Sequence, residues 1–323
     1  EAWPRPYVIS PLLDFPPMPQ TLLIDSVIRS IQTGSLYALM ALGITLTFAV
    51  MKLPNFAHAE YITVGAYAAL IVSLFTEAGP LVVMLVAFVA AAVVALLTHF
   101  AVFRPMEKAQ TSTYTMLLSS FAIGLILRYI LFLMADTFEL FDKRIGVPLE
   151  IMYRGNGVIL TNIFVWVVPT SIVLVILLSL LLNYTELGRE MRALAINYQL
   201  AQVIGIRVER VKQFTWLIVG GMAGVAGALW GIQTAVNPLM GWLAILSVFA
   251  AAILGGLQSY TGTILGAYVV AFSENTLMQV LHFYFDLNFS FKPAIPFIII
   301  ILVLLFRPQG FTEFFNTAGK LKR

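Results

Sequence analysis

Long apolar runs separated by short polar stretches define this chain. Six runs are continuously or almost continuously apolar, and most approach the roughly 20 residues that a helix needs to cross a hydrocarbon core: 34–50, 81–103, 113–134, 163–183, 214–235 and 293–306. Three more, 55–76, 241–256 and 262–285, are interrupted by polar residues or glycines. The pattern predicts an all-α polytopic membrane protein with about eight to nine transmembrane helices, eight if one of the glycine-broken segments is re-entrant.

The hydrophilic segment 184–213 also follows a helical pattern, but outside any apolar run. Its apolar residues recur at helical spacing, three before Asn197 and three after it: Leu187, Met191 and Leu194, then Leu200, Val203 and Ile204. We expect two short amphipathic helices on the membrane surface. Two interpretations stay open: the segment presents an ordered surface to a cytoplasmic partner, or its arginines merely orient the chain.

The ends of the chain and its loops complete the predicted organisation. Residues 1–20 form a proline-rich irregular arm, and 21–33 form an amphipathic interfacial segment held by Asp25 and Arg29. Residues 136–161 form the longest connection, and 312–323 a polar tail. If 184–213 is cytoplasmic, alternation places other basic residues on the same side: Lys52, Arg104, Lys108, Arg307, Lys320, Lys322 and Arg323. The positive-inside rule thus predicts a cytoplasmic tail and an external arm.

Composition excludes several classes of protein. With 60% hydrophobic and 11% charged residues and a mean hydropathy of +0.92, the chain is not an ordinary soluble globule. It has no cysteine, so disulfides and thiolate chemistry are excluded. Its net charge of +3 comes from loop residues and indicates membrane orientation, without nucleic-acid binding. No phosphate-binding loop or catalytic set is present and the three histidines are isolated, so we expect no enzyme, metal or cofactor site in this chain.

A stripe of glycines predicts close helix packing in the run 214–235. Gly220, Gly224, Gly227 and Gly231 follow at i, i+4, i+7 and i+11. Glycine lets helix backbones approach closely where lipid provides no hydrophobic drive for association. The partner helix belongs either to this chain or to a second subunit.

Polar residues at membrane depth are candidates for a translocation pathway, because they are costly there. Asn55, His58 and Glu60 stand near the start of one segment, where a helix would place Asn55 and His58 on one face and Glu60 on another. Glu274 and Asn275 lie midway through a second. Interhelical hydrogen bonding is the alternative role, and Arg128 is one partner that Glu274 could pair with.

Four blocks of the chain carry a resemblance to a known family, in matching order and spacing. They are GSLYALMALGITLTFAVMKLPNFAHAEYITVGAY (34–67), LGREMRALAINYQLAQVIGI (187–206), NPLMGWLAILSVFAAAILGGLQSYTGTILGAYVVAFSE (237–274) and LVLLFRPQGF (302–311). Together they resemble the membrane-spanning permease of branched-chain amino acid ABC importers, over 34–311. Ala59 stands where the family's N-F-A-H-G-E element has glycine.

The resemblance implies a subunit in the cytoplasmic (inner) membrane that works with protein partners and lipid. Those partners are a second homologous permease, two cytoplasmic ATP-binding subunits that carry ATP and Mg, and an extracytoplasmic amino-acid-binding protein. The segment 184–213 becomes the cytoplasmic coupling loop, which would meet the ATPase through six residues: Gly188, Arg189, Glu190, Arg192, Ala195 and Asn197.

The cargo implied by the resemblance is an apolar amino acid, whose pathway needs dipoles for the charged ends. Helix starts near Asn55 and near 261–263 would offer N–H groups to the carboxylate. The pathway candidates are Asn55, His58, Glu60, Thr261, Thr263, Glu274 and Asn275. The alternatives are an ABC permease for urea, amides or sugars, an ion-coupled secondary transporter that uses Glu60 or Glu274, and a noncatalytic scaffold.

Overall fold

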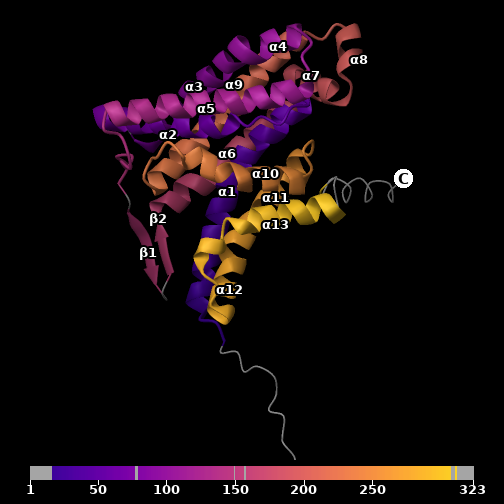
Figure 1. Cartoon of the computed structure of the whole chain (residues 1–323). Coiled ribbons are helices and arrows are strands. Elements are labelled where there is room, and N and C mark those ends of the chain that lie inside the picture. The colour runs from indigo at the N-terminus through magenta and orange to yellow at the C-terminus, as the bar shows by residue number, and fades with distance from the viewer. Residues whose placement is uncertain (1–16, 77–78, 149, 156–157, 307–309, 311–323) are drawn as a thin grey trace, which may run out of the picture.

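The computed structural model describes residues 17–76, 79–148, 150–155, 158–306 and 310. Most of these residues are helical, and Figure 1 shows the helices gathered into one bundle. The predicted irregular arm, apart from residues 17–20, and the predicted tail 312–323 lie outside the described residues.

The helices and strands follow one another in this order: α1 (Gln20–Met51), α2 (His58–Phe75), α3 (Pro80–Thr98), the π-helical turn η1 (His99–Phe103), α4 (Arg104–Lys108), α5 (Thr113–Thr137), β1 (Ile151–Gly155), β2 (Val158–Thr161), α6 (Asn162–Tyr184), α7 (Glu186–Ile196), α8 (Tyr198–Val203), α9 (Val208–Gln233), α10 (Met240–Gly255), α11 (Tyr260–Phe272), the π-helical turn η2 (Ser273–Leu277), α12 (Met278–Phe285), the 3₁₀ turn η3 (Phe289–Phe291) and α13 (Ala294–Phe306).

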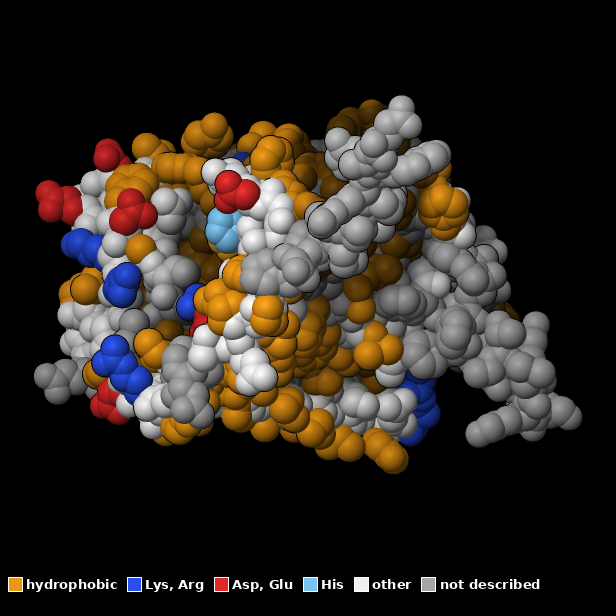
Figure 2. Space-filling model, turned by 90° about the horizontal axis from the view of Figure 1, so that it is seen from below, with side chains coloured by type: hydrophobic (Ala, Val, Ile, Leu, Met, Phe, Trp, Pro, Cys, Tyr) orange, Lys and Arg blue, Asp and Glu red, His pale blue; other side chains and the backbone are white. Residues whose placement is uncertain are grey.

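Seven helical segments in the described residues are long and apolar enough to cross a membrane, and two shorter apolar helices, α10 and α13, accompany them. This confirms the predicted polytopic helical membrane protein. Figure 2 shows one face covered largely by hydrophobic side chains, with charged side chains gathered mainly along one edge. Such a surface suits contact with lipid over its apolar band.

The longest helix, α1, runs through the centre of the bundle and is buried over most of its length. It packs against α11, α9, α10 and α6. Residues 21–33, which were predicted to lie at the interface, form the first turns of α1 and continue directly into the span. No proline or glycine interrupts the helix before Gly34, and the Ser30 hydroxyl donates to the Ser26 carbonyl within the helix, 2.8 Å away.

The glycine stripe of α9 packs against α3 and α2 of the same chain. Gly220 and Gly224 face the backbone of α3 at Ala91 and Ala87, and Gly227 faces the Ile62 carbonyl oxygen in α2. A Cβ at any of these three glycines would overlap the neighbouring helix. The close approach that the stripe predicts therefore joins α9 to helices of its own chain.

The connection 138–161 contains a pair of short strands. Strands β1 and β2 pair in antiparallel fashion, with Ile151 opposite Thr161, and the Val236 N–H donates to the Lys143 carbonyl 2.8 Å away. In Figure 1 this hairpin lies at the opposite end of the molecule from α4, α7 and α8. The two ends of the bundle are therefore built differently: one carries a hairpin, and the other a group of short helices.

We expect Gly227→Leu to destabilise the protein strongly, because the new side chain meets the backbone of α2 and overpacking alone costs about 1–3 kcal/mol. Thermal unfolding in detergent, followed by size-exclusion chromatography, measures the effect. Gly79→Ala is the matched control, since a Cβ there has no neighbour within 4 Å. Equal stability of the two variants would contradict the tight α9–α2 contact.

Candidate functional site

The segment 184–213 forms two short helices, α7 and α8, each capped by a side chain. The Thr185 hydroxyl accepts from the Gly188 N–H at 3.0 Å, and the Asn197 side-chain oxygen accepts from the Leu200 N–H at 3.0 Å. α7 buries Gly188, Met191 and Leu194 against the bundle. Asn197 thus ends one helix and starts the next, which sets the angle between them.

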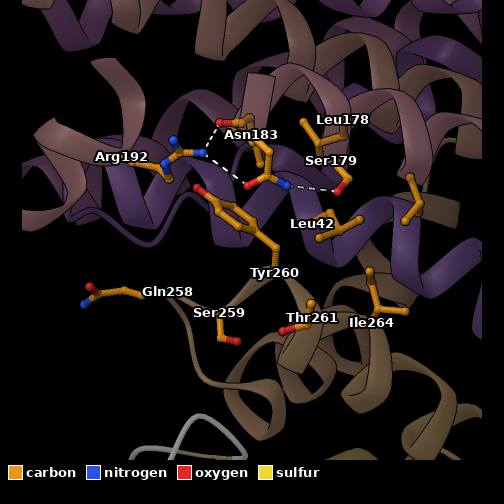
Figure 3. Close-up of a pocket in the computed structure, with 12 residues that line it drawn as sticks. Leu42, Leu178, Ser179, Asn183, Arg192, Gln258, Ser259, Tyr260, Thr261 and Ile264 are labelled. Atoms are coloured by element: carbon orange, nitrogen blue, oxygen red, sulfur yellow. Dashed lines mark hydrogen bonds between the residues drawn. The ribbon is translucent and has the colours of Figure 1, made fainter. Parts of the chain in front are cut away.

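Two of the residues predicted to meet an ATPase, Gly188 and Arg192, fasten α7 to α6. Gly188 is buried, and a Cβ there would overlap the carbonyl oxygens of Leu181 and Leu182. The Arg192 guanidinium donates to the Leu182 carbonyl and to the Asn183 side-chain oxygen, the latter at 3.2 Å (Figure 3). Their inward position follows from the helix period, since Gly188 and Arg192 lie four residues apart on one face.

Lys52 is a functional candidate that the sequence pattern did not identify, since it served there only to orient the chain in the membrane. It follows α1 in a left-handed conformation, with φ of 56°. Its ammonium donates to the Ala195 carbonyl at 2.8 Å and to the Gln258 side chain at 3.3 Å, and burial lowers its pKa. Lys52 therefore joins the end of α1 to α7 and to the turn between α10 and α11. The position of this lysine directly after a span was the feature of the sequence that could have indicated its role.

A cavity of about 410 Å³ lies between α1, α6, α7 and the start of α11. In Figure 3, Arg192 and Asn183 lie on one side of it, Leu42 and Ile264 on the other, and the Tyr260 ring between them. Polar and apolar side chains both line this space, so it can hold water or an amphipathic molecule.

Of the two pathway candidates at the start of α11, Thr261 lies at the cavity and Thr263 lies in the core. Thr261 lines the cavity, whereas the buried Thr263 hydroxyl contacts the Thr45 hydroxyl at 2.7 Å. The Ser259 hydroxyl caps α11 by accepting from the Gly262 N–H at 3.2 Å. One of the N–H groups expected to bind a carboxylate is therefore already bonded within the chain.

The apolar stripe of α8 faces away from the bundle. Leu200 is 57% exposed, Val203 83% and Ile204 65%, and the neighbouring Ile196 is also exposed. On the other side of α8, the Lys212 ammonium lies 5.1 Å from the centre of the Tyr198 ring and donates to Glu107 at 2.7 Å. α8 is thus held from α9 while its hydrophobic side chains remain uncovered by the described residues of this chain.

The Asn55, His58 and Glu60 group does not form one cluster on a helix. Asn55 precedes α2, and its side-chain oxygen accepts from the Ala57 N–H at 3.1 Å. The expectation that Asn55 and His58 share a helix face is therefore wrong. The His58 ring bonds the Met40 carbonyl at 2.8 Å and occupies the space that Gly43 leaves open. Both residues shape the connection between α1 and α2.

Glu60, and not Glu274, forms a buried ion pair with Arg128. Arg128 on α5 donates to one Glu60 oxygen from Nε at 2.9 Å and from Nη2 at 2.6 Å, and its guanidinium lies 4.2 Å from the centre of the Trp242 ring. The suggested Arg128–Glu274 pair is therefore wrong. A second contact joins α5 to the residues just before α2: the Ser120 hydroxyl accepts a hydrogen bond from the Phe56 N–H at 3.2 Å.

Glu274 lies in η2 and accepts two hydrogen bonds from other helices. The Tyr37 hydroxyl of α1 donates at 2.8 Å, and the Ser247 hydroxyl of α10 donates at 2.5 Å. The structure thus separates the predicted pathway residues into four places: the α1–α2 connection with α5, the cavity near α7, the buried contact of Thr263 with α1, and η2. Among the described residues, no three His, Asp or Glu side chains group as a metal site requires.

We expect Arg128→Gln to lower stability by roughly 3–5 kcal/mol, because it leaves the Glu60 carboxylate buried without its partner. The double variant Glu60→Gln/Arg128→Gln removes both charges and should recover much of that loss. Thermal unfolding of the two single variants and the double variant gives the coupling. Strictly additive losses would contradict a direct pair.

Comparison with known families and proteins identifies the family of this chain. A family model described as "Branched-chain amino acid transport system / permease component" matches residues 26–304. A probable branched-chain amino acid transport permease protein LivH of Methanocaldococcus jannaschii is 35% identical, over 86% of this chain and 89% of that protein. The high-affinity branched-chain amino acid transport system permease proteins BraD of Pseudomonas aeruginosa and LivH of Escherichia coli are 29% and 27% identical, each over 89% of this chain and 94% of its own length.

Proposed function

The chain belongs to the permease-component family of branched-chain amino acid transport systems, and on that premise we propose that it is the membrane-spanning subunit of an ATP-driven importer of branched-chain or related apolar amino acids. The family match over 26–304 carries the proposal, since it covers every helix from the first turns of α1 almost to the end of α13. The subunit works by alternating access in the cytoplasmic membrane, and ATP is hydrolysed elsewhere.

The proposed assembly supplies what this chain lacks. A second homologous permease completes the pathway, two cytoplasmic ATP-binding subunits carry ATP and Mg, and an extracytoplasmic protein delivers the amino acid. Because the sequence contains no phosphate-binding loop, the energy must enter through contact with a partner. The orientation proposed here places α4, α7, α8 and the C-terminus in the cytoplasm, in accord with Lys52, Arg104 and Lys108.

The proposed contact with the ATP-binding subunit consists of the exposed side of α7 and the apolar stripe of α8. Arg189 is exposed and available for this contact, whereas Gly188 and Arg192 support it from inside. A ligand or partner shifts a conformational equilibrium only by its difference in affinity between the states. Lys52 and Arg192 provide connections through which movement of α7 would displace α1, the α10–α11 turn and α6.

The arrangement of the buried carboxylates supports this proposal over an ion-coupled secondary transporter. A coupling carboxylate has to gain and lose a proton and to reach water during the cycle. Glu60 accepts two bonds from Arg128, and Glu274 accepts bonds from Tyr37 and Ser247. Both carboxylates therefore hold neighbouring helices together through interhelical hydrogen bonds.

We expect uptake of radiolabelled leucine to depend on this gene and on ATP. In the cells that produce the chain, deleting its gene should abolish most high-affinity leucine uptake, and complementation should restore it. Uptake should fall when ATP is depleted and persist when a protonophore collapses the proton gradient while ATP is maintained. Uptake that follows the proton gradient and ignores ATP would favour the secondary transporter.

We expect Val203→Glu to reduce co-purification with the ATP-binding subunit at least about tenfold, because a charge on the uncovered apolar face of α8 must be desolvated on docking. Gln202→Glu is the matched control, since it adds the same charge at an exposed position on the other side of the helix. Affinity purification of the tagged chain, followed by quantitative mass spectrometry, measures the ratio. Unchanged recovery with Val203→Glu would contradict the docking surface.

A further inference from the structure

A second cavity lies at the end of the bundle opposite α7 and α8. It has a volume of about 210 Å³ and is enclosed by α1, α9, η2 and the residues before α13. The side chains that determine its chemistry are Arg29, Lys292, Asn275, Gln233, Trp230 and Leu36. A water molecule takes about 30 Å³ of liquid, so the cavity has room for a small organic molecule.

The two cations of this cavity differ in their partners. Arg29 pairs with Asp25 at 2.7 Å on the outer side of α1. The Lys292 ammonium donates to the neutral Asn275 side-chain oxygen at 2.8 Å, and among the described residues it forms no ion pair with an acidic side chain. The cavity therefore presents positive charge that an anionic group can neutralise.

The charge of Lys292 depends on its surroundings in the cavity. Burial lowers the pKa of Lys292, the negative charge of Glu274 acts in the opposite direction, and the positive charge of Arg29 lowers it further. Glu274 is itself bonded by Tyr37 and Ser247. A bound carboxylate would strengthen the charged form of the lysine in the same way that Glu274 does.

The wall that carries Asn275 is a π-helical turn, η2. A π turn inserts an extra residue into the helical repeat and redirects the side chains that follow, and such turns recur at functional sites. Here Glu274 is buried toward Tyr37 and Ser247, whereas Asn275 lines the cavity. The Asn275 amide nitrogen donates to the Ala271 carbonyl at 2.9 Å, so its oxygen is held facing Lys292.

We propose that this cavity is a binding site for a small amino acid on the external side, in which Lys292 and Arg29 bind the carboxylate and Trp230 and Leu36 contact the apolar side chain. The identity of the cargo rests on the proposed function, whereas the site itself rests on the cavity and its charges. Two cations at one end and an aromatic ring with a leucine nearby suit a molecule with one anionic and one apolar end.

The absence of cysteine from the sequence allows a site-specific test. Thr33 also lines the cavity, so Thr33→Cys introduces a single thiol there with little change in volume. In intact, energy-depleted cells of the native host, a membrane-impermeant maleimide should label this thiol. L-leucine should slow the labelling at least about fivefold, whereas leucinol, which lacks the carboxylate, should slow it much less.

Variants of the lysine identify the group that binds the carboxylate. In the Thr33→Cys background, Lys292→Gln should abolish protection by leucine and Lys292→Arg should retain it. Lys143→Gln is the control, since Lys143 is an exposed lysine of the connection before the hairpin and does not line this cavity. Thr137→Cys, at the exposed end of α5, is the control for the thiol: the maleimide should label it at the same rate with and without leucine. Immunoblotting shows that each variant is present in equal amount.

Three outcomes would overturn the proposal: leucine that leaves the labelling rate of Thr33→Cys unchanged, equal protection by leucine and leucinol, or full protection in Lys292→Gln. Leucine uptake by energised wild-type cells separates a failure of the cavity site from a failure of the proposed function. Normal ATP-dependent uptake without protection refutes the cavity and leaves the proposed function intact. Absence of such uptake in wild-type cells refutes the proposed function, while the effect of leucine on labelling still decides the site.

Discussion

Close contact between helix backbones organises this bundle. Lipid chains are as apolar as leucine, so a helix gains little by hiding hydrophobic side chains from them. α9 instead brings Gly220, Gly224 and Gly227 against the backbones of α3 and α2. This packing leaves no space for larger side chains and holds α2, α3 and α9 as one unit. Other helices pack around this unit, and α5 is joined to it by the Arg128–Glu60 ion pair.

Polar side chains inside the bundle act mainly as specific connections between helices. A buried ion pair costs desolvation that its attraction only partly offsets, so it specifies an arrangement more clearly than it stabilises one. Arg128 with Glu60 places the otherwise exposed α5 against α2, and Glu274 with Tyr37 and Ser247 joins η2 to α1 and α10. These contacts explain why charged groups occur in such an apolar chain.

The end of the molecule that bears α7 and α8 combines rigid attachment with an uncovered surface. Arg192 and Gly188 fix α7 to α6, and Lys52 connects it to α1 and the α10–α11 turn. α8 meanwhile exposes Leu200, Val203 and Ile204. A partner docked on that surface would act on three parts of the bundle at once. At the other end, the cavity beside Lys292 offers a separate place for the cargo's carboxylate.

The sequence was sufficient to predict the class of fold, most of the spans, the two short helices α7 and α8 and the close packing at the glycine stripe, because these depend on hydrophobic periodicity and residue size within one segment. It also indicated the family through blocks spread along the chain. The contacts that the polar side chains make became clear only from the packing of the helices. This packing paired Arg128 with Glu60 and not with Glu274, turned Gly188 and Arg192 inward, left the α8 stripe outward, and gave Lys52 its contacts. Those outcomes depend on which helices lie side by side, and sequence spacing carries that information only within a single helix.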